Sequence, residues 1–122
     1  MSIKRFEEID AWKSARELVQ QVYHAIKMNK KFQADFRLMN QIQGAAVSTM
    51  SNIAEGFSRK SNKEFIQYLF ISKSSAAEVQ SQLYVALDQN YINKETFNNI
   101  YAQAETVSKL NSGFIKYLRT KI

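Results

Sequence analysis

The sequence predicts an all-α fold, an antiparallel up-down-up-down four-helix bundle that forms one domain over residues 1–122. The first observation is compositional: the chain has no proline and only 3 glycines, so it lacks the residues that usually punctuate β-sandwiches and barrels. The second is that apolar residues recur every three or four positions in four long segments. The third is that the connections between these segments are short, which places consecutive helices side by side and antiparallel.

The first helix is expected over residues 10–28, because apolar side chains separated by 3, 4, 3 and 4 residues fall on one helical face. Asp10 is placed to accept a hydrogen bond from an unpaired amide of the first turn. A polar connection from Asn29 to Asp35 follows the helix. The apolar stripe consists of Trp12, Ala15, Val19, Val22 and Ile26.

The second helix is expected over residues 36–57, with Asp35 capping its amino end. Its buried stripe keeps the same spacing but mixes apolar side chains with small and polar ones. The stripe consists of Met39, Ile42, Ala46, Thr49, Ile53 and Gly56.

The third helix is expected over residues 62–89, because Ser61 and Glu64 have the spacing of a capping box and a long apolar pattern follows them. Asn90 ends that pattern. The stripe consists of Phe65, Leu69, Ser72, Ala76, Val79, Leu83 and Ala86.

The fourth helix is expected over residues 94–120, with Asn93 as the capping residue. Its pattern continues to within a few residues of Ile122. The stripe consists of Phe97, Ile100, Ala104, Val107, Asn111, Phe114 and Leu118.

Additional apolar residues lie beside or outside these four stripes, and many of them are aromatic. Large apolar surfaces that a bundle core does not cover usually mark interfaces, so we expect a homo-oligomer. The same residues have a structural alternative, which is simply to thicken the core. They are Leu18, Tyr23, Ile66, Tyr68, Phe70, Ile71, Tyr84, Tyr101, Ile115 and Tyr117.

The chain is basic, with a formal net charge of +6. Such a charge favours contact with nucleic acid, an anionic membrane surface or an acidic protein. An up-down-up-down topology brings both termini and the connection between the second and third helices to one end, which gathers eight cations there. Glu7, Glu8, Glu55 and Glu64 lie near this end and dilute its field. The cations are Lys4, Arg5, Arg59, Lys60, Lys63, Lys116, Arg119 and Lys121.

No catalytic or metal-binding pattern is recognisable in the sequence. The chain has no cysteine, and its one histidine, His24, has no acidic partner at the spacing of metal ligands. No nucleophile-base pair and no phosphate-binding glycine loop occurs. We therefore expect a protein that is not an enzyme, with no cofactor, no metal and no small-molecule substrate. No apolar run approaches the roughly 18 residues of a membrane span, so a cytoplasmic protein without membrane contact is expected.

The most specific stretch runs from Gln41 to Arg59 and contains Asn52, Glu55 and Gly56. Asn52 and Glu55 are three residues apart and share a helix face, while Gly56 permits a close approach or the end of a helix. Arg59 can bind either a carboxylate or a phosphate. The cluster is therefore either a polar clasp, a set of side-chain contacts that ends the second helix and fixes the following turn, or a direct ligand site. The structural role is favoured.

At this stretch the sequence resembles the four-helix bundle proteins encoded by intervening sequences within bacterial 23S rRNA genes. The resemblance covers nearly the whole chain and includes Ala45-Ala46-Val47-Ser48, Ser51-Asn52-Ile53-Ala54-Glu55-Gly56 and Glu64-Phe65. The family usually has proline where this chain has Met50.

The resemblance implies a bundle that assembles as a ring-like homopentamer. The chain is also similar to the accessory variability determinant of diversity-generating retroelements, a basic pentameric barrel that engages a reverse transcriptase and nucleic acid. Our hypothesis is a non-enzymatic bundle that binds RNA, rRNA in particular, or a ribonucleoprotein partner. The alternative is a protein-interaction scaffold that binds a partner enzyme without recognising nucleic acid.

Overall fold

In the computed structural model, which describes residues 2–122, the chain forms four long helices, as the sequence predicts. These helices are α1 (Asp10–Lys27), α3 (Phe36–Phe57), α4 (Asn62–Asp88) and α5 (Lys94–Arg119). A 3-10 turn, η1 (Phe6–Glu8), precedes α1, and a short helix, α2 (Lys30–Ala34), follows it. Each long helix begins at the expected residue and ends there or one residue earlier.

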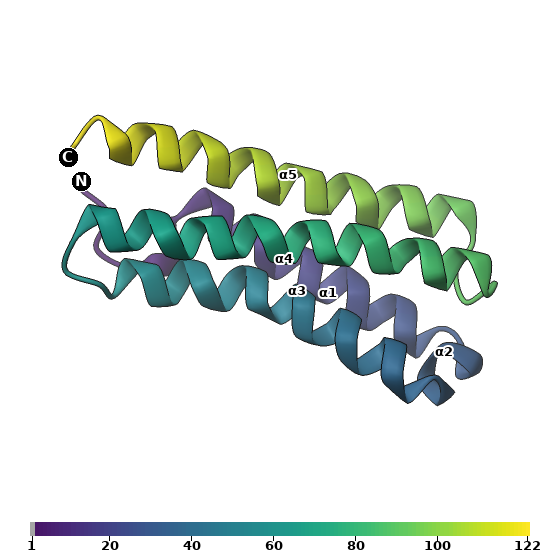
Figure 1. Ribbon diagram of the computed structural model, residues 1–122. Helices are drawn as coiled ribbons and strands as arrows, with labels where there is room; N and C mark the ends of the chain where they lie inside the picture. The colour runs from purple at the N-terminus through teal and green to yellow at the C-terminus, as the bar shows by residue number, and fades with distance from the viewer. Residues whose placement is uncertain (1) are drawn as a thin grey trace.

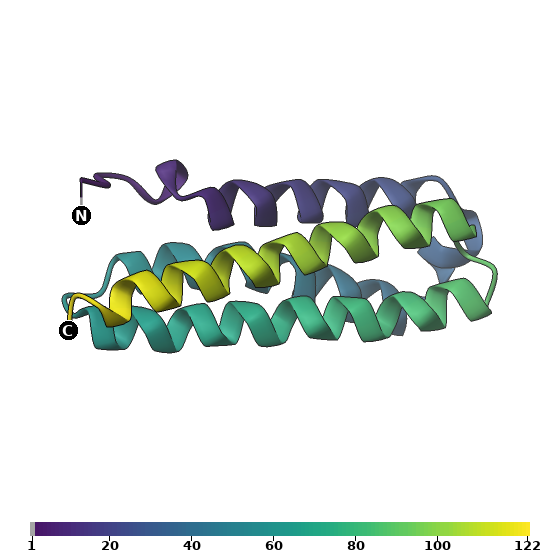
Figure 2. The same cartoon turned by 90° about the horizontal axis from the view of Figure 1, so that it is seen from above.

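The long helices form an elongated bundle in which consecutive helices run in opposite directions (Figures 1 and 2). Each packs against two others, in the order α1, α3, α4, α5 around the bundle. Both chain ends and the turn between α3 and α4 lie at one end, and α2 and the turn between α4 and α5 lie at the other (Figure 1). The expected up-down-up-down arrangement is the one observed.

The connection from Asn29 to Asp35 differs from the expected irregular segment, because it contains helix α2. Asn29 caps α2 by accepting a hydrogen bond from the amide of Phe32 at 3.0 Å. The Phe32 side chain is only 1% exposed and stacks on Tyr91 with ring centroids 5.3 Å apart. One buried ring in a polar segment therefore folds this connection onto the end of the bundle.

Tyr91 also joins the two connections at this end of the bundle. Its hydroxyl donates a hydrogen bond to Asp35 Oδ2 at 2.9 Å, and this bond raises the pKa of Tyr91 above its ordinary value. Asn90 precedes it in a left-handed conformation with φ of 61°, which asparagine tolerates. The Tyr91 amide donates to the carbonyl of Ala86 at 2.9 Å, a Schellman-type end for α4.

Three of the four expected amino-terminal caps are present. Asp35 accepts from Leu38 N at 3.1 Å, Ser61 from Glu64 N at 3.1 Å, and Asn93 from Thr96 N at 2.8 Å. The expected cap by Asp10 is wrong, because Asp10 is already the first residue of α1 and Ile9 occupies the capping position without a side-chain bond.

The predicted stripes form most of the core. The exceptions are Trp12, Val19, Met39 and Phe114, which are half-buried and pack against the core from its edge. Several residues expected beside the stripes are also buried in the bundle, namely Leu18, Ile66 and Ile115.

A polar layer crosses the core near the middle of α3, α4 and α5. Its three side chains, Thr49, Ser72 and Asn111, are all 0% exposed. Ser72 Oγ donates to the carbonyl of Thr49 at 2.7 Å and accepts from Asn111 Nδ2 at 2.9 Å. Asn111 Oδ1 is buried without a hydrogen-bond partner. The layer fixes the axial alignment of the three helices, since sliding one helix would leave further polar groups unpaired.

Gly56 is required by the packing of α3 against α4. A Cβ atom at this position would lie 2.7 Å from Tyr68 Cβ and 2.8 Å from Phe65 Cδ1, well inside van der Waals contact. We expect Gly56→Ala to lower the free energy of unfolding by about 1–3 kcal/mol, the usual cost of overpacking. Urea denaturation followed by circular dichroism measures this change.

Gly113→Ala is the matched control, because nothing lies within 4 Å of a Cβ built there. It should raise the free energy of unfolding by about 0.5–1 kcal/mol, since alanine favours the helix over glycine. Equal effects of the two substitutions would show that steric contact at Gly56 is unimportant.

The unpaired oxygen of Asn111 generates a second stability prediction. Asn111→Leu removes a buried unsatisfied acceptor and keeps the branched shape of the side chain, so we expect the free energy of unfolding to rise by about 1 kcal/mol. Asn111→Ala should instead lower it by about 2 kcal/mol, because a cavity remains. If Asn111→Leu lowers the free energy of unfolding as much as Asn111→Ala does, the buried amide of Asn111 does not destabilise the fold.

Candidate nucleic-acid interface

The eight cations expected at one end of the bundle are all exposed and lie on segments that meet there. We call this group the cationic pole. Its members come from the amino-terminal segment before η1, from the turn between α3 and α4 with the first residues of α4, and from the last turn of α5 with the residues after it (Figure 2). The structure therefore brings together residues that are more than 100 positions apart in the sequence.

Arg5 is neutralised within its own segment. Its guanidinium donates to Glu7 Oε2 at 2.6 Å, and this hydrogen bond lowers the pKa of the Glu7 carboxyl and raises the pKa of Arg5. The carboxylate of Glu8 accepts from the Arg5 amide at 2.9 Å. Both acids near the amino terminus thus hold the local chain and reduce the field of this part of the pole.

Arg59 is also engaged by its own chain. Its guanidinium lies over the Tyr68 ring at 4.8 Å from the ring centroid, contacts the Tyr68 hydroxyl, and donates to Glu55 Oε1 at 3.3 Å. These contacts tie the end of α3 to the second turn of α4. The clasp interpretation of Arg59 and Glu55 is the one that this geometry supports.

Asn52 belongs to a different contact from Glu55. Its amide nitrogen donates to the carbonyl and to the hydroxyl oxygen of Ser48, both at 2.9 Å. Ser48 Oγ in turn lies 2.9 Å from Ser75 Oγ on α4. Ser48 thereby links α3 to α4, and Asn52 supports Ser48 from within α3. Helix α3 continues through Met50 as one uninterrupted helix.

Two cations of the pole lie over exposed aromatic rings. The Arg119 guanidinium is 5.5 Å from the centroid of the Phe70 ring, and Lys121 Nζ is 5.3 Å from that of Tyr117. Phe70 is 41% exposed and Tyr117 is 42% exposed. This combination offers both a positive charge and a ring face at the surface.

Lys60, Lys63 and Lys116 are in no ion pair among the residues that the structure describes. Lys60 and Lys63 flank Ser61 at the amino end of α4, where the helix dipole is positive and disfavours cations. Lys116 lies in the last turn of α5, where the dipole favours it. Glu64, in the first turn of α4, offsets part of the charge of Lys60 and Lys63.

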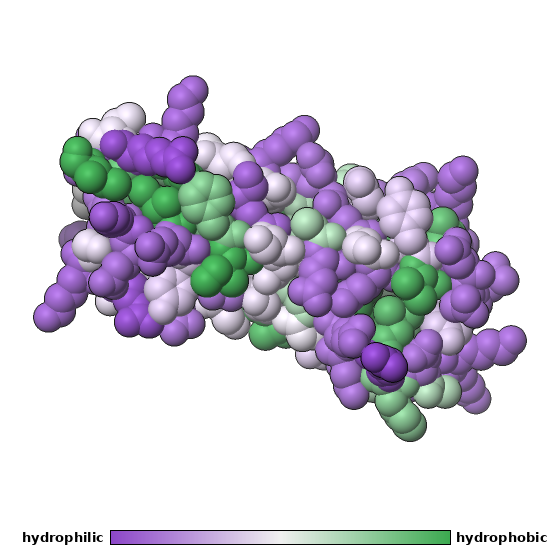
Figure 3. All heavy atoms as spheres, viewed as in Figure 1, coloured by the Kyte–Doolittle hydropathy of each residue, from purple (hydrophilic) through white to green (hydrophobic). Residues whose placement is uncertain are grey.

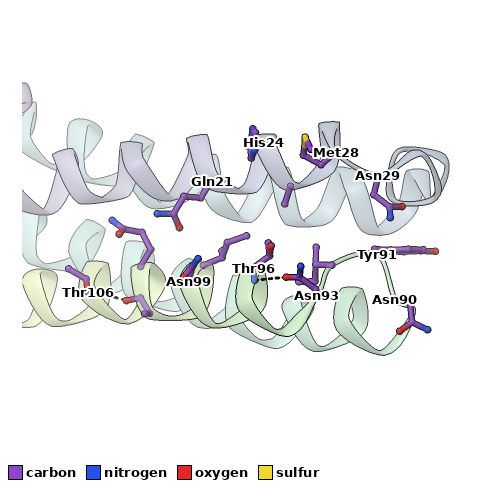
Figure 4. A pocket seen from close by; sticks show the side chains of 15 residues that line it. Gln21, His24, Met28, Asn29, Asn90, Tyr91, Asn93, Thr96, Asn99 and Thr106 are labelled. Atoms are coloured by element: carbon purple, nitrogen blue, oxygen red, sulfur yellow. Dashed lines mark hydrogen bonds between the residues drawn. The ribbon is translucent and has the colours of Figure 1, made fainter.

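An open groove of about 920 Å³ between α1 and α5 was not expected from the sequence. Gln21 and Asn99 lie on opposite sides of it, and Asn29 and Tyr91 lie at its α2 end (Figure 4). His24 is exposed on its α1 side. In the sequence, only the high frequency of asparagine around the turn between α4 and α5 could have indicated this groove.

The part of the chain from Ser2 to Ile122 contains no cluster of three His, Cys, Asp or Glu side chains suited to a metal ion. Within the same residues, no helix is both long and apolar enough to cross a bilayer. These observations assign neither a chemistry nor a location.

The fold and the charged end define a class of protein, a basic α-helical bundle with a cationic pole. Residues 7–113 match the family model described as 23S rRNA-intervening sequence protein, and the chain therefore belongs to that family. No curated protein matches the chain.

A solved structure from Bacteroides thetaiotaomicron, described as a protein of unknown function from the S23 ribosomal protein family, has a similar fold. It matches with a TM-score of 0.80 and 24% identity over 87% of this chain and 98% of its own. At this identity the likeness shows the fold alone. Neither description names a catalytic activity.

The clasp between Arg59 and Tyr68 can be measured with a double-mutant cycle. We expect Arg59→Ala to lower the free energy of unfolding by about 0.5–1 kcal/mol, because an exposed cation-π contact and a surface ion pair are lost. In a Tyr68→Ala background the same substitution should cost less, because only the ion pair with Glu55 is then lost. Equal costs in both backgrounds would show that the two side chains do not interact.

Proposed function

We propose that this protein is a non-enzymatic, oligomeric bundle whose cationic pole binds the phosphate backbone of RNA, with rRNA as the first candidate. The observation that carries the proposal is a group of five lysines that are in no ion pair among the described residues, at the same end as two exposed rings. They are Lys4, Lys60, Lys63, Lys116 and Lys121. Phosphate contacts from lysine supply affinity with little base specificity.

The exposed rings of Phe70 and Tyr117 suit unpaired bases once the exposed side chains of Arg119 and Lys121, which lie over them, move aside. Bases stack on aromatic side chains in single-stranded regions, and each such contact typically contributes about 1–3 kcal/mol. The pole therefore suits an RNA loop or end better than a regular duplex, because a duplex keeps its bases stacked inside. The family description, which names an intervening sequence of 23S rRNA, supports RNA over other polyanions.

Within this proposal, the contacts that each cation already makes indicate how much it should contribute to RNA binding. Arg5 and Arg59 already have carboxylate partners in their own chain, so they contribute less than the lysines. Lys4, Arg119 and Lys121 are exposed and complete the surface. Asn52, Glu55 and Gly56 support the packing of α3 on α4 instead of touching the ligand.

The test is fluorescence anisotropy of nuclease-treated protein with structured RNA, DNA duplex and heparin across a salt titration. Replacing Lys60, Lys63 and Lys116 together with alanine should weaken RNA binding and reduce the slope of log K against log salt by about 2–3. Each lost phosphate contact accounts for roughly 0.7–0.9 of that slope.

The matched control replaces Lys27, Lys30 and Lys31 with alanine, which removes the same charge from the opposite end of the bundle. This control should leave the slope nearly unchanged. If both triple variants behave alike, RNA binding does not use the cationic pole.

The second candidate is a protein-interaction scaffold, favoured by the exposed apolar residues Ile71, Tyr84 and Val85 on α4. In that case positive charge mainly accelerates encounter with a partner. Equal, salt-sensitive binding to every polyanion, or no binding, would favour the scaffold. A partner captured after nuclease treatment and at moderate salt would identify it.

A further inference from the structure

The end of the bundle opposite the cationic pole carries two exposed apolar side chains. Met28, which follows α1, is 72% exposed, and Phe36, the first residue of α3, is 68% exposed. Of the large apolar side chains in the described part of the chain, only that of the terminal Ile122 is more exposed. Figure 3 shows hydrophobic side chains among hydrophilic ones at the end where α2 lies. We call residues 27–37 the α2 tip.

The α2 tip is a folded segment, because contacts on its inner side hold it against the bundle. Gln33 Nε2 donates hydrogen bonds to the carbonyls of Ile26 and Lys27 at 3.1 and 3.0 Å, which pairs two carbonyl groups at the end of α1. The Phe32 ring is buried in the same segment. The tip therefore buries one phenylalanine and holds a second one, Phe36, in water.

The α2 tip is also strongly basic. Its four cations, Lys27, Lys30, Lys31 and Arg37, are all exposed. Within the described residues, none of the four is in an ion pair or lies over an aromatic ring. The one acid of the tip, Asp35, accepts hydrogen bonds from a backbone amide of α3 and from a tyrosine hydroxyl. The four cations are therefore available to a partner outside the chain.

We infer that the α2 tip binds the surface of an anionic phospholipid membrane. Phenylalanine and other apolar side chains next to lysine and arginine are typical of segments that lie at the membrane interface. The apolar groups enter the boundary between headgroups and acyl chains, while the long cationic side chains keep their charges among the phosphates. Such a contact needs no apolar run of spanning length, the feature on which the expectation of no membrane contact was based.

A lipid surface fits this tip better than a protein pocket or RNA does. A protein partner has to supply a pocket shaped for each apolar side chain and an acid near the cations, whereas a fluid bilayer adapts to projecting side chains and presents phosphates over its whole surface. RNA supplies phosphates and can stack a base on Phe36, but it offers no apolar environment for Met28. The turn between α4 and α5, at the same end, changes the charge little, because it adds Asp88, Lys94 and Glu95.

Co-sedimentation with vesicles tests the charges of the tip. We expect the protein to bind vesicles made from an equal mixture of phosphatidylcholine and phosphatidylglycerol, and not vesicles of phosphatidylcholine alone. Replacing Lys27, Lys30 and Lys31 together with alanine should weaken binding by about 100-fold, because each cation near an anionic surface typically strengthens binding by roughly fivefold.

The matched control replaces Lys60, Lys63 and Lys116 with alanine, which removes the same charge from the cationic pole. The pole lies at the other end of helices that are about 40 Å long, well beyond the distance over which salt screens a charge. This control should bind the mixed vesicles as the wild type does, within about twofold.

A second pair of variants tests the apolar side chains at constant charge. Met28→Ser combined with Phe36→Ser should weaken binding to the mixed vesicles by at least about tenfold, because two apolar side chains no longer leave water. Ile71→Ser combined with Val85→Ser removes exposed apolar side chains from α4 and should leave binding unchanged. All four residues are exposed, and circular dichroism confirms that each variant is folded.

Fluorescence quenching by lipids with brominated acyl chains reports which end of the bundle touches the membrane. Trp12 is the only tryptophan of the chain and lies in the first turn of α1, at the end that holds the cationic pole. We expect no quenching of Trp12 in the wild type. The variant Phe36→Trp should gain a fluorescence component that the brominated lipids quench.

Three results would overturn the assignment of the tip as a membrane contact. The first is a wild type that does not bind the mixed vesicles, and the second is equal vesicle binding by the wild type and the tip variants; either would leave the tip for a protein partner. The third is quenching of Trp12, which would show that the cationic pole contacts the lipid. If the lysine variant of the tip loses affinity for RNA but not for vesicles, the tip is an RNA site. RNA binding by the pole is measured separately by anisotropy, so its failure would leave the membrane contact standing.

Discussion

The close approach of α3 and α4 is the constraint on which the remaining structure depends. Gly56 leaves room for Phe65 and Tyr68, so the two helices can meet directly after a short turn. Small hydroxyl residues then bond across the same interface further along, including Ser48 with Ser75. Because this contact sets the turn, it also sets where Arg59, Lys60 and Lys63 emerge.

The polar layer adds a second consequence of that contact. Helices that meet through apolar side chains alone can slide along one another at little cost. A chain of hydrogen bonds from Thr49 through Ser72 to Asn111 prevents such sliding of α3, α4 and α5. Alignment along the bundle axis is therefore specified in the core. The same alignment brings the last turn of α5, with Lys116, to the end where α4 begins.

The helices and their order could be predicted because each long segment repeats its apolar pattern many times. Helix α2 could not, since five residues contain too little periodicity and one ring, Phe32, decides the fold of the segment. The prediction of Asp10 as the cap was wrong for a local reason. Ile9 is buried and occupies the capping position, so α1 begins at Asp10, one residue earlier than it would if Asp10 were the cap.

The cationic pole could be predicted in outline, because topology alone gathers the charges. Its internal pairing could not, since the contact of Arg59 with Tyr68 depends on how tightly the turn closes. The groove between α1 and α5 could not be predicted either, because it also depends on how helices pack in space. Gln21 and Asn99 belong to helices far apart in the chain, and only the spacing between α1 and α5 makes their side chains neighbours of one cavity.

Charge distribution connects the pole with assembly. The helices of the bundle run nearly along one direction, so copies related by rotation about an axis in that direction keep their poles on the same side (Figure 1). In the oligomer that we propose, such a rotation would place the unpaired lysines of every copy on one rim. A long RNA that contacts several copies gains affinity from each additional contact through high effective concentration. The unpaired lysines of one chain would form a weak site, whereas the same lysines repeated in every copy of such an oligomer would form a stronger and more steeply salt-dependent one.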